Sequence, residues 1–143
     1  MFQNLQKKLQ ATLGLQLRLD SKEWREFRSL LGKEKERVQI THLGWVADFP
    51  DPHSFMSIFT SQSESNYTGW KNTKYEKIVE EAVATQDENR RLQLYNEAQK
   101  ILLVDEAVIM PLFYSSHQAL VKSDLKGVTL NALDRWYFKR IKR

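Results

Sequence analysis

The first third of the chain alternates between two patterns of apolar and polar residues. Over residues 2–9 the apolar side chains recur at the spacing of one helix face, and Gly14 is well placed to end that helix. Over 15–19 leucines alternate with polar residues, which predicts a half-buried strand. Apolar residues at helical spacing over 24–31 then predict a second helix, with Asp20 as its cap. Helices and strands that alternate with short connections are typical of a parallel or mixed α/β sheet.

A strand and a short helix are predicted on either side of residues 44–52. Residues 38–43 are β-branched or apolar at most positions, which favours a strand. Asp51 followed by Pro52 is typical of a helix start, and the apolar residues within 55–59 share one helix face. The turn between them carries an indole and a carboxylate just beyond the end of the strand, where ligands bind in open α/β sheets. A flat apolar wall beside a fixed anion suits an organic cation such as a peptide α-amino group.

The middle of the chain predicts a polar loop followed by two antiparallel helices. Residues 60–70 are rich in Ser, Gln, Asn, Thr and Gly, which is typical of a loop. Thr73 and Glu76 have the spacing of a capping box and predict that a helix begins there. Apolar residues line one side of this helix over 75–83 and, after a short break, one side of the next helix over 94–102.

The last third of the chain predicts short strands. Residues 108–114 are rich in strand-forming side chains, and Pro111 within them argues for an edge, a bulge or a crossover. A second short strand is predicted over 118–121, followed by a turn at 126–127 and a final strand over 135–139.

The composition excludes several kinds of site. The 143 residues are 41% hydrophobic and 28% charged, an ordinary balance for a globular domain with a core. There is no cysteine, which excludes disulfides and thiolate metal sites, and the three histidines lack the close spacing of metal ligands. The chain has neither a nucleophile elbow nor a phosphate-binding glycine loop. We therefore expect no metal, no cofactor and no enzymatic activity.

The charge of the chain is positive but dispersed. The formal net charge is +4, and the basic residues are scattered except within 139–143. We interpret that cluster as a solvated terminus rather than as an arm that binds nucleic acid. No apolar run approaches the roughly 20 residues of a membrane span, and residues 1–8 lack the apolar stretch of a secretory signal.

Residues 45–52, W-V-A-D-F-P-D-P, resemble a motif of the bacterial extracytoplasmic solute-binding proteins of peptide ABC transporters, the oligopeptide-binding type especially. Four further segments resemble motifs of the same family, in the same order along the chain: N-Y-T-G-W at 66–70, N-T-K-Y-E-K-I at 72–78, R-R-L-Q-L-Y-N-E-A at 90–98 and I-M-P-L-F-Y at 109–114. Five motifs in the right order across most of the chain make the resemblance specific.

The resemblance implies a fold and a division of the chain. The fold class would be α/β, a partial periplasmic-binding-protein-like lobe of the class II type with a mixed sheet flanked by helices. Residues 1–115 would be the C-terminal part of the second, carboxy-terminal lobe, and 116–143 the return segment that packs on the first lobe. Family members are long two-lobed exported proteins, so we expect this chain to be a fragment or a truncated gene product.

The function implied by the resemblance is peptide binding for an ABC transporter, in the periplasm or cell envelope. The loaded protein would deliver an oligopeptide to the membrane permease. Without most of the first lobe, the chain is expected to bind peptides weakly or not at all, and aromatic residues 136–138 would be exposed or would pack against a second copy in a homodimer. Two alternatives remain: a stand-alone interaction or assembly protein, and a basic nucleic-acid binder.

The resemblance also assigns roles to residues of the 44–52 turn. Asp48 would pair with the α-amino group of a bound peptide, and a capping or turn aspartate is the alternative. Trp45 would form a wall of the ligand pocket, with a place in the core as the alternative.

Three further residues are candidates for ligand contact. His42 would meet a peptide carboxylate when protonated, or be a strand histidine with a satisfied hydrogen bond. Asn66 would hydrogen-bond the peptide backbone, or form a turn of its own loop. Tyr114 would be a hinge or cleft residue beside the crossover, or a core residue.

Overall fold

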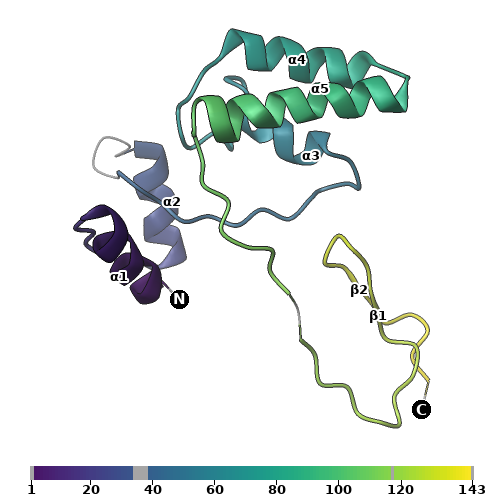
Figure 1. Ribbon diagram of the computed structural model, residues 1–143. Helices are drawn as coiled ribbons and strands as arrows, with labels where there is room; N and C mark the ends of the chain where they lie inside the picture. Colours follow the sequence, from purple (N-terminus) through teal and green to yellow (C-terminus); the bar gives the residue numbers. More distant parts are fainter. Residues whose placement is uncertain (1, 34–38, 117, 143) are drawn as a thin grey trace. The chain divides into compact units, whose positions relative to one another are not determined.

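The computed structural model describes residues 2–33, 39–116 and 118–142 (Figure 1). Its elements in chain order are the helices α1 (Phe2–Leu13), α2 (Trp24–Lys33) and α3 (His53–Met56), the 3-10 turn η2 (Ser57–Phe59), the helices α4 (Thr73–Ala84) and α5 (Glu88–Lys100), the π-helical turn η3 (Ile101–Asp105), and the strands β1 (Thr129–Leu130) and β2 (Trp136–Tyr137). The chain divides into two compact units, Met1–Thr41 and His42–Arg143.

Two helices form the first unit, as the apolar spacing predicts. Helix α1 ends where expected, because Gly14 takes a φ of 68° and donates its N–H to the carbonyl of Gln10 at 3.0 Å. Helix α2 begins only at Trp24, so the prediction that Asp20 caps it is wrong. The carboxylate of Asp20 instead lies 3.7 Å from the ammonium of Lys22, within the same exposed stretch.

Four segments predicted to be strands form none within the described part of the chain. They are 15–19, the described residues 39–43 of the run that begins at Val38, 108–114, and 118–121. Val38 itself lies outside the described residues. A strand is stabilised by hydrogen bonds to a neighbouring strand, and the described residues supply these segments with no such neighbour. Their apolar side chains therefore remain largely exposed, as at Ile40, Met110 and Leu120.

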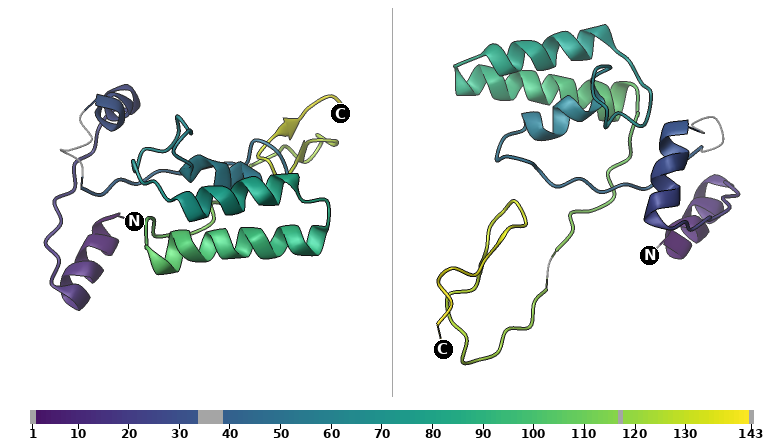
Figure 2. Two further views of the ribbon diagram at one scale, coloured as in Figure 1. Left: turned by 90° about the horizontal axis from the view of Figure 1, so that it is seen from above. Right: turned by 180° about the vertical axis from the view of Figure 1, so that it is seen from behind.

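The buried core lies between α4 and α5, which run antiparallel and side by side in every view (Figures 1 and 2). The members of this core share positions on the facing sides of the two helices and of η3: Tyr75, Ile78, Val79, Ala82, Leu94, Tyr95, Ala98, Ile101 and Leu102. The predicted helix pair is confirmed, because residues at i, i+3 and i+4 share a face and a short connection brings two such faces together.

The start of α4 differs by one residue from the predicted capping box. Asn72 is the cap, and its Oδ1 accepts a hydrogen bond from the N–H of Tyr75 at 3.0 Å. Thr73 is already the first helical residue. The carboxylate of Glu76 accepts from the backbone N–H of Ser61 at 2.9 Å, so this residue holds the preceding loop rather than the helix start.

Tyr75 joins α3 to the helix pair. Its side chain is fully buried, and its hydroxyl donates to the carbonyl oxygen of Met56 at 2.6 Å. The ring of Trp70 packs edge-on against it, with the ring centroids 4.9 Å apart. Burial raises the pKa of the Tyr75 phenol, because the charged form would lose its hydration.

The end of the chain forms a small antiparallel hairpin, β1 paired with β2, in which Leu130 lies opposite Trp136. The strand predicted over 135–139 is thus confirmed in its centre. Gly127 lies beside this hairpin with a φ of 82°, and a Cβ there would come within 2.0 Å of the carbonyl oxygen of Arg140. Only glycine permits this close approach of two backbone segments. Among the described residues, no helix combines the length and apolarity that crossing a bilayer requires.

Candidate functional site

The turn formed by residues 45–54 is tied together by one buried side chain, Ser54. The Oγ of Ser54 accepts a hydrogen bond from the backbone N–H of Asp48 at 2.7 Å. Its carbonyl oxygen accepts a second from the indole Nε1–H of Trp45 at 3.0 Å. Because Ser54 is only 2% exposed, water competes only weakly for the groups in these bonds. The 45–54 turn therefore presents the Trp45 ring and the Asp48 side chain in a fixed relation.

The carboxylate of Asp48 is exposed to solvent. Within the described part of the chain, no hydrogen bond or ion pair to this carboxylate is found, although its backbone N–H is bonded to Ser54. An aspartate that served only its own turn would accept a nearby backbone N–H with its side chain. Here that acceptor is the serine hydroxyl, which leaves the Asp48 carboxylate able to accept donors from a ligand.

Trp45 is not a member of the buried core. Its side chain is 42% exposed, and its only polar atom is already bonded to Ser54. A ring that is held by its nitrogen and partly exposed to solvent suits apolar contact with a ligand.

A bidentate ion pair anchors the end of the 45–54 turn to helix α5. The two terminal nitrogens of Arg91 each lie 2.7 Å from a different carboxylate oxygen of Asp51. Oδ1 of Asp51 also accepts the backbone N–H of His53 at 2.8 Å, although helix α3 begins at His53 with Pro52 at the cap position, one residue later than predicted. The hydrogen bonds from Arg91 lower the pKa of the Asp51 carboxyl below its usual value, and the opposing effect of burial is smaller.

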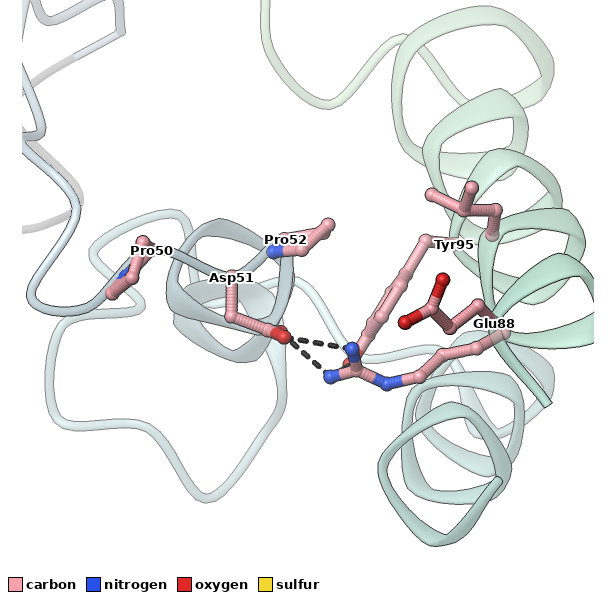
Figure 3. Close-up of a pocket in the computed structure, with 7 residues that line it drawn as sticks. Pro50, Asp51, Pro52, Glu88 and Tyr95 are labelled. Atoms are coloured by element: carbon pink, nitrogen blue, oxygen red, sulfur yellow. Dashed lines mark hydrogen bonds and ion pairs between the residues drawn. The ribbon is translucent and has the colours of Figure 1, made fainter. Parts of the chain in front are cut away.

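A shallow cavity of about 260 Å³ lies beside this ion pair (Figure 3). The figure shows the Asp51 side chain pointing toward α5, the helix that carries Glu88 and Tyr95. The guanidinium of Arg91 lies 5.1 Å from the centre of the Tyr95 ring. The lining residues are Pro50, Asp51, Pro52, Glu88, Arg91, Leu92 and Tyr95. Asp48 and Trp45 do not line this cavity, so it is distinct from the predicted ligand contacts.

His42 lies against another segment of the chain. Its imidazole is nearly parallel to the ring of Phe113, with the ring centroids 6.3 Å apart. The residue is exposed and does not lie in a strand. A carboxylate contact of His42 stays a prediction, and the alternative of a strand histidine is wrong because no strand forms there.

Asn66 uses its side chain to close its own loop. It is 8% exposed. Its Nδ2 donates to the carbonyls of Phe59, Thr60 and Trp70, and its Oδ1 accepts from the Thr68 hydroxyl. A ligand contact by Asn66 would require one of these bonds to break, so the turn-forming alternative describes this structure.

Tyr114 is fully exposed, at 103%, so the alternative of a core residue is wrong. In the described part of the chain, no hydrogen bond or ring contact links Tyr114 or Asn66 to the 45–54 turn. The structure thus brings Trp45 and Asp48 together but does not bring Tyr114 or Asn66 to them.

Sequence reasoning missed two residues that organise this region. One serine in a short polar stretch gives no signal in its spacing, so the sequence does not point to Ser54. Arg91 belongs to a helix motif, and its spacing of four residues from Tyr95 on one helix face is the signal for their contact. Neither pattern could have pointed to Asp51, which lies 40 residues before Arg91.

Among the described residues, no group of three or more His, Asp or Glu side chains is arranged to hold a metal ion.

The fold matches part of a known peptide-binding protein. A solved structure of the murein tripeptide-binding protein MppA, in its unliganded open form, superimposes with a TM-score of 0.64 at 24% identity. The match covers 69% of this chain and 19% of that protein. The fold is therefore a partial lobe of the α/β, periplasmic-binding-protein type, as the motifs predict.

Comparison of sequences gives the same class of protein. The chain is 31% identical over 124 residues to the dipeptide-binding protein DppE of Bacillus subtilis, a match that covers 87% of this chain and 22% of the relative. It is 28% identical over 138 residues to the oligopeptide-binding protein OppA of the same organism, a match that covers 96% of this chain and 25% of that relative. It is 30% identical over 135 residues to the dipeptide-binding protein of Escherichia coli, covering 92% and 25%. No family model matches the chain.

The chain is thus a homologue of part of the oligopeptide- and dipeptide-binding proteins, and the resemblance predicted from its motifs is confirmed. It spans about a quarter of the length of the curated relatives it matches. These relatives are binding proteins rather than enzymes, in agreement with the expectation that the chain is not an enzyme.

Proposed function

We propose that the chain is the C-terminal part of a peptide-binding component of an ABC transporter, and that the 45–54 turn contacts the amino end of the peptide. In this proposal Asp48 pairs with the α-amino group and Trp45 forms an apolar wall beside it. The observation that carries the proposal is the exposed Asp48 carboxylate, whose backbone is fixed by Ser54 while its oxygens have no partner among the described residues. A positioned carboxylate is the group that a cationic amine requires.

The rest of the proposal follows from the relatives. Curated relatives carry names for oligopeptide and dipeptide binding, and several are named as periplasmic. We propose the same ligand class, a partner permease in the membrane, and a location in the periplasm or cell envelope. We further propose that 1–115 belong to the second lobe and 116–143 to the return segment, a division that differs from the two compact units of the structure because it concerns a larger, two-lobed protein.

Binding by the isolated chain tests the fragment part of this proposal. Peptides held between two lobes bury both faces, whereas a single partial lobe leaves one face in water. Isothermal titration of the 143-residue chain with a mixed pool of tri- to pentapeptides should therefore show weak heats or none. Tight binding by the isolated chain would contradict the proposal that a second lobe is required.

A chimera tests the role of Asp48. The chain would replace the matched segment of DppE, and peptide affinity would be compared for Asp48→Ala and for Glu81→Gln, a control at an exposed carboxylate of α4. Asp48→Ala should weaken binding of free-amine peptides by about tenfold or more, the worth of a charge-assisted hydrogen bond. The same substitution should weaken the binding of N-acetylated peptides much less. Equal losses for both kinds of peptide would remove Asp48 from this role.

A second candidate function is self-assembly. The rings of Trp136 and Phe138 stack in parallel, with centroids 6.4 Å apart, and both side chains are substantially exposed. Exposed aromatic pairs are typical of interfaces. Light scattering on the purified chain distinguishes the candidates: a dimer that Trp136→Ser dissociates would support assembly, and a monomer would leave only the peptide-binding proposal.

A further inference from the structure

The contacts of helix α5 extend to the candidate ligand residues through one continuous series of hydrogen bonds. The guanidinium of Arg91 holds both oxygens of Asp51. The backbone carbonyl of Asp51 accepts the N–H of Ser54 at 3.0 Å. Ser54 in turn binds the backbone of Asp48 and the indole of Trp45. No other side chain among the described residues makes a bidentate contact with the 45–54 turn.

Arg91 is itself held firmly in place. Its Nε donates to the carbonyl of Ala82 at 3.1 Å, near the end of α4, and one terminal nitrogen donates to the Tyr95 hydroxyl at 3.3 Å. The guanidinium also lies over the Tyr95 ring. A planar guanidinium fixed at three points presents its remaining N–H groups in one direction, which suits a carboxylate at a defined position. The helix pair therefore contacts the turn through a side chain that is itself held in place, and the rings of Tyr95 and His53 also lie near each other, with centroids 6.5 Å apart.

The neighbouring arginine shows what is specific about this arrangement. Arg90 lies on the same helix and also binds a carboxylate, that of Glu81 at 2.8 Å. Both members of that pair are more than half exposed, whereas the side chains of Arg91 and Asp51 are 28% and 24% exposed. Glu81 is on α4 and makes no contact with the turn. Arg90 therefore supplies a matched control for a charge on α5 that does not reach the site.

We infer that Arg91 is a positioning residue, which acts through Asp51 and Ser54 to set the orientation of Trp45 and Asp48. The consequence of this positioning for ligand binding rests on the proposed function, but the positioning itself is a property of the unliganded chain. It assigns Arg91 no contact with the peptide, because Arg91 lines a cavity that neither Trp45 nor Asp48 lines.

The indole N–H signal of Trp45 measures this positioning directly. The chain has four tryptophans, so a ¹⁵N-labelled sample shows four indole signals, and Trp45→Phe assigns the one of interest. Asp51→Asn removes the charge while leaving the contacts of Arg91 with Ala82 and Tyr95 possible. We expect Asp51→Asn and Arg91→Ala to shift the Trp45 signal toward that of a solvent-exposed indole and to speed its exchange with water. Arg91→Lys, which keeps the cation, should move the Trp45 signal less than Arg91→Ala does.

The controls separate positioning from loss of fold. Arg90→Ala should leave the Trp45 signal in place. The indole N–H signal of Trp70, whose ring packs against buried Tyr75, should persist in Asp51→Asn. If Arg91→Ala does not fold, the Asp51→Asn result decides alone. An unchanged Trp45 signal in Asp51→Asn, or an equal shift in Arg90→Ala, would overturn the inference. Because no peptide is present, such a failure is distinct from a failure of Asp48 to bind the amine in the chimera.

Discussion

Two leucines of this chain occupy opposite environments, and the contrast separates the helix pair from the segments that follow it. Leu94, on α5, is 2% exposed, whereas Leu120 is 107% exposed. Both belong to apolar patterns that predict burial. The helical pattern finds its partner across a short connection, between α4 and α5. The strand pattern finds none among the described residues, because a strand requires a neighbour that is usually distant in sequence.

The contrast teaches where the stability of this chain resides. The buried cluster holds nearly all of the fully buried side chains, and it uses only α4, α5, η3 and the neighbouring α3 region. Many large apolar residues outside it, such as Ile40 and Leu120, are exposed and contribute little. Substitutions of one residue type should therefore have large effects in the cluster and almost none at these exposed positions.

The largest effect is expected from truncating a core leucine. Leu94→Ala should lower the free energy of unfolding by about 2–5 kcal/mol, through lost burial and the cavity left behind. Leu120→Ala should change it by less than about 0.5 kcal/mol. Urea titration followed by far-UV circular dichroism measures both. Equal effects at the two positions would mean that the extended segment is buried in solution.

The next effect comes from removing a buried hydrogen bond. Tyr75→Phe should cost about 1–2 kcal/mol, because the part-buried carbonyl of Met56 loses the donor that the buried hydroxyl supplies. Tyr114→Phe, at a fully exposed position, is the matched control and should be neutral. The same urea titrations compare the two. A neutral Tyr75→Phe would show that Met56 finds another partner.

The Asp51–Arg91 ion pair should make the thermal stability of the chain depend on pH. The pKa of Asp51 is lower in the folded chain than in the unfolded chain, because Arg91 donates to the charged carboxylate. The stabilisation is therefore present above about pH 4 and is lost as the pH falls through the folded pKa. The difference in Tm between the unmodified chain and Asp51→Asn should be largest near neutral pH and should shrink below about pH 4.

Glu88 and His53 also lie near this pair, and both are present in each of the two chains compared. Arg90→Ala, which removes an exposed pair, should lower Tm less than Arg91→Ala at pH 7. A difference between the unmodified chain and Asp51→Asn that stays constant from pH 7 to pH 3 would contradict the proposed origin of the effect.

The smallest effect is expected at the end of the helix pair, and it is stabilising. Ala107 takes a φ of 46°, a left-handed conformation that follows the last turn of η3. The N–H of Val108 closes this end by donating to the carbonyl of Leu102 at 2.9 Å. Ala107→Gly should raise the free energy of unfolding by roughly 0.5–1 kcal/mol, because glycine takes this conformation without strain. Gly69→Ala, at a φ of 70°, is the reverse test and should destabilise.

Local sequence determined the helices and the class of protein. The periodic apolar residues of α1, α2, α4 and α5 predict these elements because each helix forms hydrogen bonds within itself. The motif at 45–52 predicts the relationship to peptide-binding proteins. It also predicts that an acid and an indole stand on one turn, since both features depend on residues close together in the sequence.

Only the tertiary structure decided how that turn is held. The bonds of Ser54 to Trp45 and Asp48, and of Arg91 to Asp51, join residues whose spacing follows no helix or strand period. Four of the strand predictions were wrong for a related reason, because pairing depends on partners that a local pattern does not specify. Sequence thus determined what each segment could form by itself, while tertiary contacts determined which side chains meet, since those meetings depend on the path of the whole chain.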